Sequence, residues 1–136
     1  MNPNKFFSEG ILHITPHETY LCDLRAYTYA ENQDSICLRL IGSKDSGMYG
    51  DPVLTATKYL FAPYLKAMDI ILESPRKMPE LVETLYMAGI ITSRKAAVEI
   101  HSGYNMYPVH ALTQDAYIWV KSQLHLAEFG ENARGH

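Results

Sequence analysis

The sequence has few cysteines, no long hydrophobic run and no excess of positive charge. Two cysteines among 136 residues are too few for a disulfide framework, so we expect a reducing, cytoplasmic setting. The longest apolar run falls far short of the roughly 20 residues that a membrane-spanning helix needs. The first residues also lack the charged and apolar regions of a secretory signal. We therefore expect a protein without a membrane partner.

The charge balance argues against a general nucleic-acid binder. Lysine and arginine number 12 and aspartate and glutamate number 15, which gives a formal net charge of −3. Nucleic-acid-binding proteins usually present a basic surface, because neutralising phosphates supplies much of their affinity. The composition therefore favours a protein or small-molecule partner, and nucleic-acid binding would need a locally basic face.

Three segments near the start of the chain have sequences typical of strands. Residues 10–14 form an apolar run that ends at Thr15-Pro16, and residues 20–30 alternate between apolar and polar side chains. Residues 31–34 are polar and read as a turn, after which residues 35–41 are again β-branched and apolar. This order predicts a three-stranded antiparallel sheet.

The rest of the chain predicts four or five helices. Asp51 and Pro52 resemble a helix start, and apolar residues spaced three or four apart continue the pattern to Leu72, with Pro63 kinking or splitting this helix. Further helices are predicted over residues 79–88, over residues 92–101 and from Gln114 onward. Glycines follow the first two of these segments at positions typical of helix stops.

These expectations define an α+β fold in a single domain, residues 1–136. The predicted sheet part is 1–50, the helical part packed on it is 51–130, and 131–136 is expected to be a flexible tail. Helices covering one face of an antiparallel sheet are a common solution to burying both apolar surfaces.

Motifs for catalysis and cofactor binding are missing. The sequence contains no Gly-x-Ser-x-Gly nucleophile turn and no glycine-rich phosphate loop. The predictions therefore include no catalytic residue and no cofactor, and they favour a protein that is not an enzyme.

Four residues have side chains that zinc prefers: His13, His17, Cys22 and Cys37. There is no Cys-x-x-Cys pair, and both cysteines fall on strand positions, where a buried thiol acts as a small hydrophobe. We expect reduced, metal-free cysteines, while a ligand role for the two histidines stays open.

Residues 80–126 suggest an alternative function. Their predicted order of helix, short connection, helix and helix matches a helix-turn-helix core. Residues 92–97, Thr-Ser-Arg-Lys-Ala-Ala, resemble the start of the second helix in phage-type helix-turn-helix domains. That resemblance implies a DNA-binding regulator. Its expected DNA contacts are Arg94, Lys95, Gln114, Lys121 and Gln123.

A second resemblance involves the first predicted strand. Residues 12–16, Leu-His-Ile-Thr-Pro, resemble the first strand of ADP-ribosyltransferase-type folds. In those folds a histidine followed by Thr-Pro or a similar pair contacts nicotinamide dinucleotide. The resemblance implies a small enzyme of that type as a further alternative.

Tyrosine is abundant, and the ten tyrosines carry the preferred interpretation. Residues 46–52 and 102–108 are both Ser-Gly segments with a Met-Tyr pair before a proline, and such side chains are enriched at protein interfaces. The expected partner-binding residues are Tyr27, Tyr29, Met48, Tyr49, Tyr104, Met106 and Tyr107.

We therefore expect a non-enzymatic accessory factor that binds another protein or protein complex through tyrosine-rich loops. It would be of the inhibitor or adaptor type, such as a counter-defence protein encoded by a phage or mobile element. Nucleic acid is a less favoured partner, and the sequence leaves the oligomeric state open.

Overall fold

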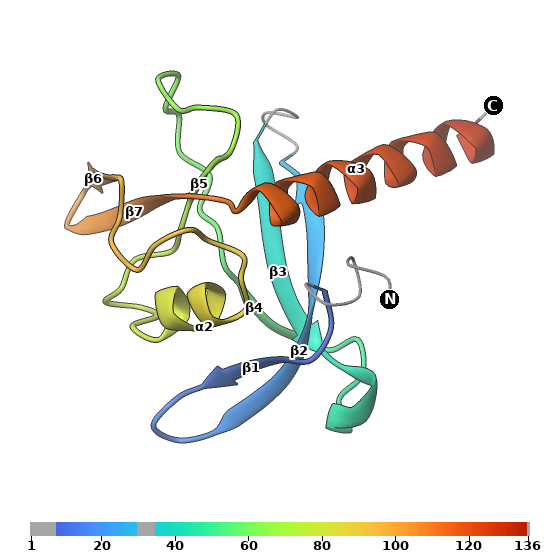
Figure 1. The fold of residues 1–136 in the computed structure, drawn as a ribbon, viewed down its shortest axis with the longest axis horizontal. Helices are drawn as coiled ribbons and strands as arrows, with labels where there is room; N and C mark the ends of the chain where they lie inside the picture. Colours follow the sequence, from blue (N-terminus) through green and yellow to red (C-terminus); the bar gives the residue numbers. More distant parts are fainter. Residues whose placement is uncertain (1–7, 30–34, 136) are drawn as a thin grey trace.

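The computed structural model describes residues 8–29 and 35–135, with the main chain alone for residues 126–135. Seven strands in two antiparallel sheets make up most of the fold, together with two α-helices and a short 3-10 turn (Figure 1). In chain order the elements are β1 (Ile11–Ile14), β2 (Thr19–Thr28), β3 (Ile36–Gly42), η1 (Lys44–Ser46), β4 (Pro52–Thr55), β5 (Asp69–Ile71), α2 (Leu81–Met87), β6 (Val98–Ser102), β7 (Asn105–Ala111) and α3 (Gln114–Gly135).

The first sheet has the strand order β1-β2-β3-β4. Strands β1 to β3 occupy the three segments predicted as strands, and the predicted turn at 31–34 lies outside the described residues. Leu24 of β2 lies opposite Leu40 of β3, which in turn lies opposite Leu54 of β4. These leucines share one face of the sheet because side chains alternate along each strand. That face of the first sheet packs against the main hydrophobic core.

The helix predicted from Pro52 to Leu72 is wrong. The segment contains strand β4, an extended connection, a loop and strand β5. Pro52 begins an edge strand, where a missing N–H is tolerated. The apolar residues have helix-like spacing because they serve two separate clusters: Ile70 and Leu72 are buried in the main core, and Leu60 and Leu65 pack in a second one.

The helix predicted over residues 92–101 is also wrong, because β6 occupies its second half. Ser102 of β6 pairs with Asn105 of β7, which leaves Gly103 and Tyr104 as a two-residue hairpin turn. Gly103 has φ +62°, as expected at the first position of a type II′ turn. The glycine expected to stop a helix instead turns a hairpin.

Helices α2 and α3 lie where residues 79–88 and the segment from Gln114 predicted helices. α3 runs as far as Gly135, so it includes most of the segment 131–136. The described residues thus contain two helices, and the predicted α+β fold with a four- or five-helix part over 51–130 is corrected to a mostly β fold. In the described ranges, no helix combines the length and apolarity needed to cross a bilayer.

The second sheet has the order β5-β7-β6 and is joined to the first by residues 56–58. The main-chain N–H of Ala56 donates to the oxygen of Leu38 on β3 (2.8 Å), whereas its oxygen accepts from Glu73 N–H (2.9 Å). Lys58 N–H donates to the oxygen of Ile71 (2.9 Å). This connecting segment therefore belongs to the edges of both sheets.

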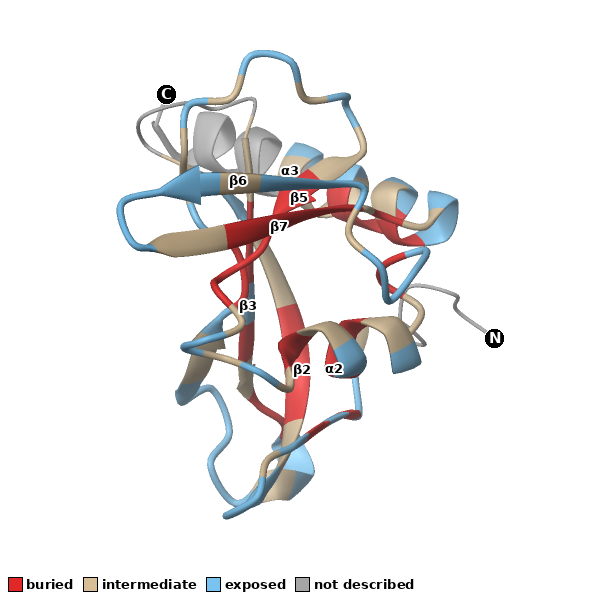
Figure 2. Ribbon diagram, turned by 90° about the vertical axis from the view of Figure 1, so that its left-hand side faces the viewer, coloured by how far each residue is buried: buried red, intermediate tan, exposed pale blue. Residues whose placement is uncertain are grey.

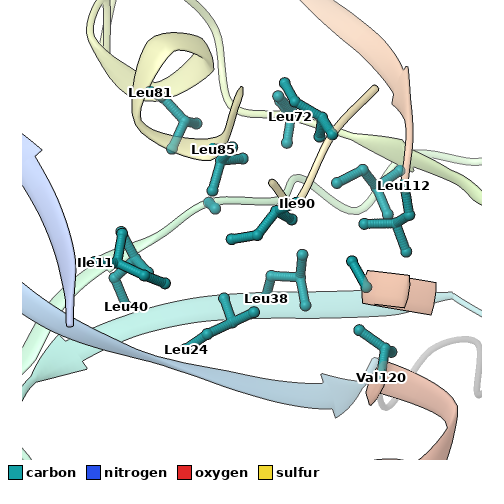
Figure 3. Packing of buried hydrophobic residues seen from close by; sticks show 14 of the residues in the cluster. Ile11, Leu24, Leu38, Leu40, Leu72, Leu81, Leu85, Ile90, Leu112 and Val120 are labelled. Atoms are coloured by element: carbon teal, nitrogen blue, oxygen red, sulfur yellow. The ribbon is translucent and has the colours of Figure 1, made fainter. Parts of the chain in front are cut away.

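The main core fills the space between the first sheet, the second sheet and the helices. Figure 2 shows the buried segments of β2, β7 and α2 facing a common interior. Figure 3 shows leucines of the first sheet meeting Leu72 and Leu112, which directly follow β5 and β7. Helix α2 contributes Leu81 and Leu85, and α3 contributes Trp119 and Val120. Each of the two helices thus buries one face, whereas the opposite face of the first sheet carries polar residues.

Thr57 is expected to be a stabilising residue at the junction between the sheets. It is buried, and its Oγ1 accepts a hydrogen bond from Leu38 N–H (3.1 Å) and lies 2.7 Å from the hydroxyl of Tyr29. Thr57→Val keeps the shape but leaves the Leu38 N–H without this partner. We expect the free energy of unfolding to fall by about 1–3 kcal/mol, measured by urea denaturation.

Thr55→Val is the matched control, because Thr55 is an exposed residue of β4. Its effect should stay within about 0.5 kcal/mol. Equal losses in the two variants would show that the Thr57 hydroxyl has no special role.

Candidate functional site

The two tyrosine-containing loops predicted as one surface lie in different parts of the fold. Tyr49 is 65% exposed between η1 and β4, and Tyr104 is 97% exposed at the tip of the β6–β7 hairpin. Figure 1 shows these two segments on opposite sides of the molecule. Both tyrosines are therefore available to a partner, but they do not form one continuous surface.

Tyr107 is buried, with 7% exposure, rather than exposed as its loop assignment implied. It lies on β7, where it packs with Ile71 and Val109. The ammonium group of Lys58 lies over its ring, 5.7 Å from the centroid. The Ser-Gly-x-x-Met-Tyr segment here is a hairpin turn followed by a strand, so alternation places this tyrosine on the packed face.

The other predicted partner-binding residues are dispersed. Tyr27 is exposed on the outer face of the first sheet with the Arg39 guanidinium over its ring. Met48 is exposed in the loop that precedes β4, and Met106 is half-buried in β7. Tyr29 is half-buried and takes part in the cavity described below.

The structure does not form the helix-turn-helix unit, because two strands separate α2 from α3. The Arg94 guanidinium binds both carboxylate oxygens of Glu83, at 2.7 and 3.0 Å, and lies 4.2 Å from the centroid of the Tyr86 ring. Hydrogen bonding to Arg94 lowers the pKa of the Glu83 carboxyl. Of the remaining expected DNA contacts, Lys95 is exposed before β6, whereas Gln114, Lys121 and Gln123 lie on α3.

We expect no sequence-specific duplex binding at physiological salt. The Arg94 guanidinium is already occupied by Glu83, so it would have to give up this pair to contact a phosphate. A gel-shift titration with a random duplex library measures this directly. A specific shift that Arg94→Ala weakens would instead favour DNA recognition.

The two cysteines lie on opposite faces of the first sheet. Cys22 lies opposite Gly42, and Cys37 lies opposite Tyr27, five residues further along β2. At strand spacing this separates them by about 17 Å, and the odd number of residues places them on different faces. A disulfide between them would need a Cα distance below about 7 Å. Within the described ranges, no cluster of three metal-ligating side chains occurs.

Both thiols are expected to be reduced and slow to react in the folded protein. Burial raises the pKa of Cys22 to about 11, so at pH 8 roughly one Cys22 in a thousand is a thiolate. Ellman's reagent should therefore titrate both thiols rapidly only after unfolding, and native mass spectrometry should give the mass of the apo chain. A stoichiometric zinc adduct would contradict this expectation.

His13 lines a cavity of about 360 Å³ together with Tyr20 and Glu80. The Thr84 hydroxyl donates to the main-chain oxygen of Glu80 (3.1 Å), so the Nδ1–H of His13 is the donor to Thr84 Oγ1 at 2.8 Å. Burial lowers the pKa of His13, and the Glu80 charge partly opposes this shift. Burial therefore favours the neutral imidazole with its proton on Nδ1. His17 is exposed, and ADP-ribosyltransferase-type activity stays a prediction.

Two exposed aromatic residues were missed by the sequence analysis. In the segment 59–68, Leu60, Ala62 and Leu65 pack against the second sheet, while Phe61 is 81% and Tyr64 is 63% exposed. The helical pattern assigned both aromatics to a buried stripe. Pro63 between them was the available signal, because proline disfavours the helix interior.

A larger cavity, of about 530 Å³, lies beside this segment. We call it the lysine cavity. Its lining comes from the facing ends of β2 and β3, from residues 58–71 and from α3. The polar and charged side chains of the lining include those of Tyr29, Lys58, Tyr59, Lys66, Lys121 and Asp69. Three regions far apart in the sequence therefore build one concave site.

The tyrosine wall of the lysine cavity is held in place. The Tyr29 hydroxyl is hydrogen-bonded to Thr57 at 2.7 Å, and its ring lies 5.3 Å from that of Tyr59 at an angle of 51°. Burial raises the pKa of Tyr29 to about 12, so its hydroxyl stays neutral at physiological pH. This wall is thus a preformed aromatic surface with a polar edge.

The charge around the lysine cavity is positive. Lys58, Lys66 and Lys121 are exposed, and in the described part of the chain the ion pairs join other residues. Asp69 is the acidic residue of the lining, and its Oδ2 accepts from the main-chain N–H of Lys66 (3.0 Å). Three lysines at one cavity make it suited to an anion, although the whole chain is slightly acidic.

No protein-family model matches the sequence, and neither the curated proteins nor the solved structures include one that is significantly similar to the chain.

Proposed function

We propose that this chain is a non-enzymatic protein-binding accessory factor that uses exposed aromatic side chains on projecting segments. The observation that carries this proposal is the exposure of three aromatic side chains, those of Phe61 (81%), Tyr64 (63%) and Tyr104 (97%). Figure 1 shows the segment between β4 and β5 and the β6–β7 hairpin on the same side of the molecule. The proposed contact surface therefore consists of Phe61, Tyr64 and Tyr104, and the buried Tyr107 is not part of it.

Exposed aromatic rings favour a partner because their burial releases much free energy. Each Phe or Tyr ring can bury about 150–250 Å² in an interface. Aromatic side chains also dominate the small set of residues that carry most binding energy. Two such rings within four residues provide a compact anchor.

The segment that presents Phe61 and Tyr64 is fixed from below. Leu60, Ala62 and Leu65 pack against Ile71, Tyr107 and Val109 of the second sheet. Fixing a segment before binding lowers the entropy lost when a partner docks. The inward leucines and outward aromatics thus have complementary roles, one in folding and the other in recognition.

The proposal includes an inhibitor or adaptor role in the cytoplasm, of the kind a phage or mobile element encodes against a host defence. The two free, buried cysteines are compatible with a reducing compartment. A small protein without an evident catalytic constellation can act by covering a surface of its target.

The experiment compares partner capture by the parent chain and by Phe61→Ala/Tyr64→Ala and Tyr104→Ala variants in extracts of its native host. Loss of an interface anchor costs about 2 kcal/mol or more, so we expect the affinity for the captured partner to fall about 30-fold. The melting temperature should stay close to that of the parent, because these rings are exposed. Met87→Ala is the control, since Met87 is an exposed apolar residue on α2.

Tyr107→Ala should behave in the opposite way. Truncation of a large buried side chain typically costs about 2–5 kcal/mol of stability, so its melting temperature should fall while the folded fraction still binds. Unchanged capture by the Phe61, Tyr64 and Tyr104 variants would remove the support for an aromatic docking surface.

A further inference from the structure

The lysine cavity has features that docking through the exposed aromatic side chains does not require. Its volume of about 530 Å³ lies within the range of small-molecule sites, about 300–1,000 Å³. The exposed side chain of Tyr64 would meet a partner at the surface, whereas the cavity is lined by the half-buried Tyr29 and Tyr59 and also by Phe61. A recessed site of this size can hold a small-molecule ligand.

The lysines around the cavity specify the charge of that occupant. Lys58 and Lys66 lie near the two ends of the segment that covers the second sheet, and Lys121 lies on α3. Lysine ammonium groups are point charges that commonly bind phosphate. The Lys58 ammonium lies over the Tyr107 ring, which leaves Lys66 and Lys121 to bind a ligand. Because the one aspartate of the lining accepts from a main-chain N–H, the cavity favours an anion.

The walls of the cavity specify the rest of the occupant. Tyr29, Tyr59 and Tyr117 line it together with the apolar Leu60, Leu65 and Leu124. Aromatic side chains stack on flat rings and are used in this way for bases in nucleic-acid-binding proteins. Inorganic phosphate would leave this apolar surface exposed to water, so a larger ligand with a flat ring fits better.

We propose that the lysine cavity binds an organic phosphate that carries an aromatic ring, of the size of a nucleoside monophosphate. The phosphate lies between Lys66 and Lys121, and the ring lies against the tyrosine wall. The Tyr29–Thr57 hydrogen bond holds this wall in place before the ligand arrives. This site adds a small-molecule ligand to the protein-binding role and does not depend on it.

Calorimetric titration of the full chain with adenosine monophosphate tests the proposal. We expect one site per chain. Adenosine and inorganic phosphate should each bind at least about tenfold more weakly, because adenosine lacks the phosphate and inorganic phosphate lacks the aromatic ring. Affinity for the nucleotide should also fall as salt rises from 50 to 300 mM, since exposed charges are screened.

Lys66→Gln/Lys121→Gln is the diagnostic variant. It should weaken nucleotide binding at least about tenfold without lowering the melting temperature, because both side chains are exposed. Lys95→Gln is the matched control, an exposed lysine outside the cavity lining. In the parent chain, amide NMR signals of residues 58–71 should shift with the nucleotide, while those of the β6–β7 hairpin should not.

Three results would overturn the proposal: no nucleotide binding at millimolar concentration, equal binding by the diagnostic variant, or inorganic phosphate binding as tightly as the nucleotide. If the diagnostic variant loses the protein partner and the parent binds no nucleotide, the lysines belong to the protein interface. That result would contradict the nucleotide-binding proposal and would not contradict the proposed protein-binding function. Loss of capture in the aromatic variants alone would leave the cavity proposal untouched.

Discussion

The fold depends on the connecting segment 56–58, which is hydrogen-bonded to both sheets. Ala56 pairs with Leu38 on one side and with Glu73 on the other, and Lys58 continues the second pairing with Ile71. A strand that leaves one sheet and enters another turns a corner between them, so both inner faces can bury their apolar side chains in one core. The leucines of the first sheet share one cluster with Ile70 and Leu72 because of this corner, and Figure 3 shows Leu72 beside them.

The same segment positions the lysine cavity. Thr57 satisfies the N–H of Leu38 and fixes the hydroxyl of Tyr29, and the next residues, Lys58 and Tyr59, line the cavity. The buried Thr57, which stabilises the junction, is thus hydrogen-bonded directly to Tyr29, a residue of the wall proposed to contact a ligand. Disturbing the junction should change the cavity before it unfolds the chain, because stability is not uniform across a structure.

Alternation and helix-end signals predicted part of this architecture. The first three strands and the helices α2 and α3 lie in segments whose local signals point to one kind of element each. The segment from Pro52 to Leu72 differs, because its apolar residues are divided between two clusters and their spacing imitates a helix. The segment 92–101 was misjudged for a local reason: Gly103 can end a helix or form a hairpin turn, and only the pairing of β6 with β7 decides between them.

The candidate site was less predictable than the fold. Tyrosine enrichment indicated an aromatic surface, but exposure depends on where each ring lies: Tyr104 is exposed in a hairpin turn, whereas Tyr107 lies on the packed face of a strand. The lysine cavity combines a strand end, a connecting segment and α3, so its positive charge is invisible in a chain whose net charge is −3. Folding brings the lysines together at the cavity. Glu73 and Glu83, the described carboxylates that form ion pairs, bind Lys77 and Arg94 elsewhere, so they do not neutralise the lysines of the cavity. Composition can therefore exclude a basic protein without excluding a basic site.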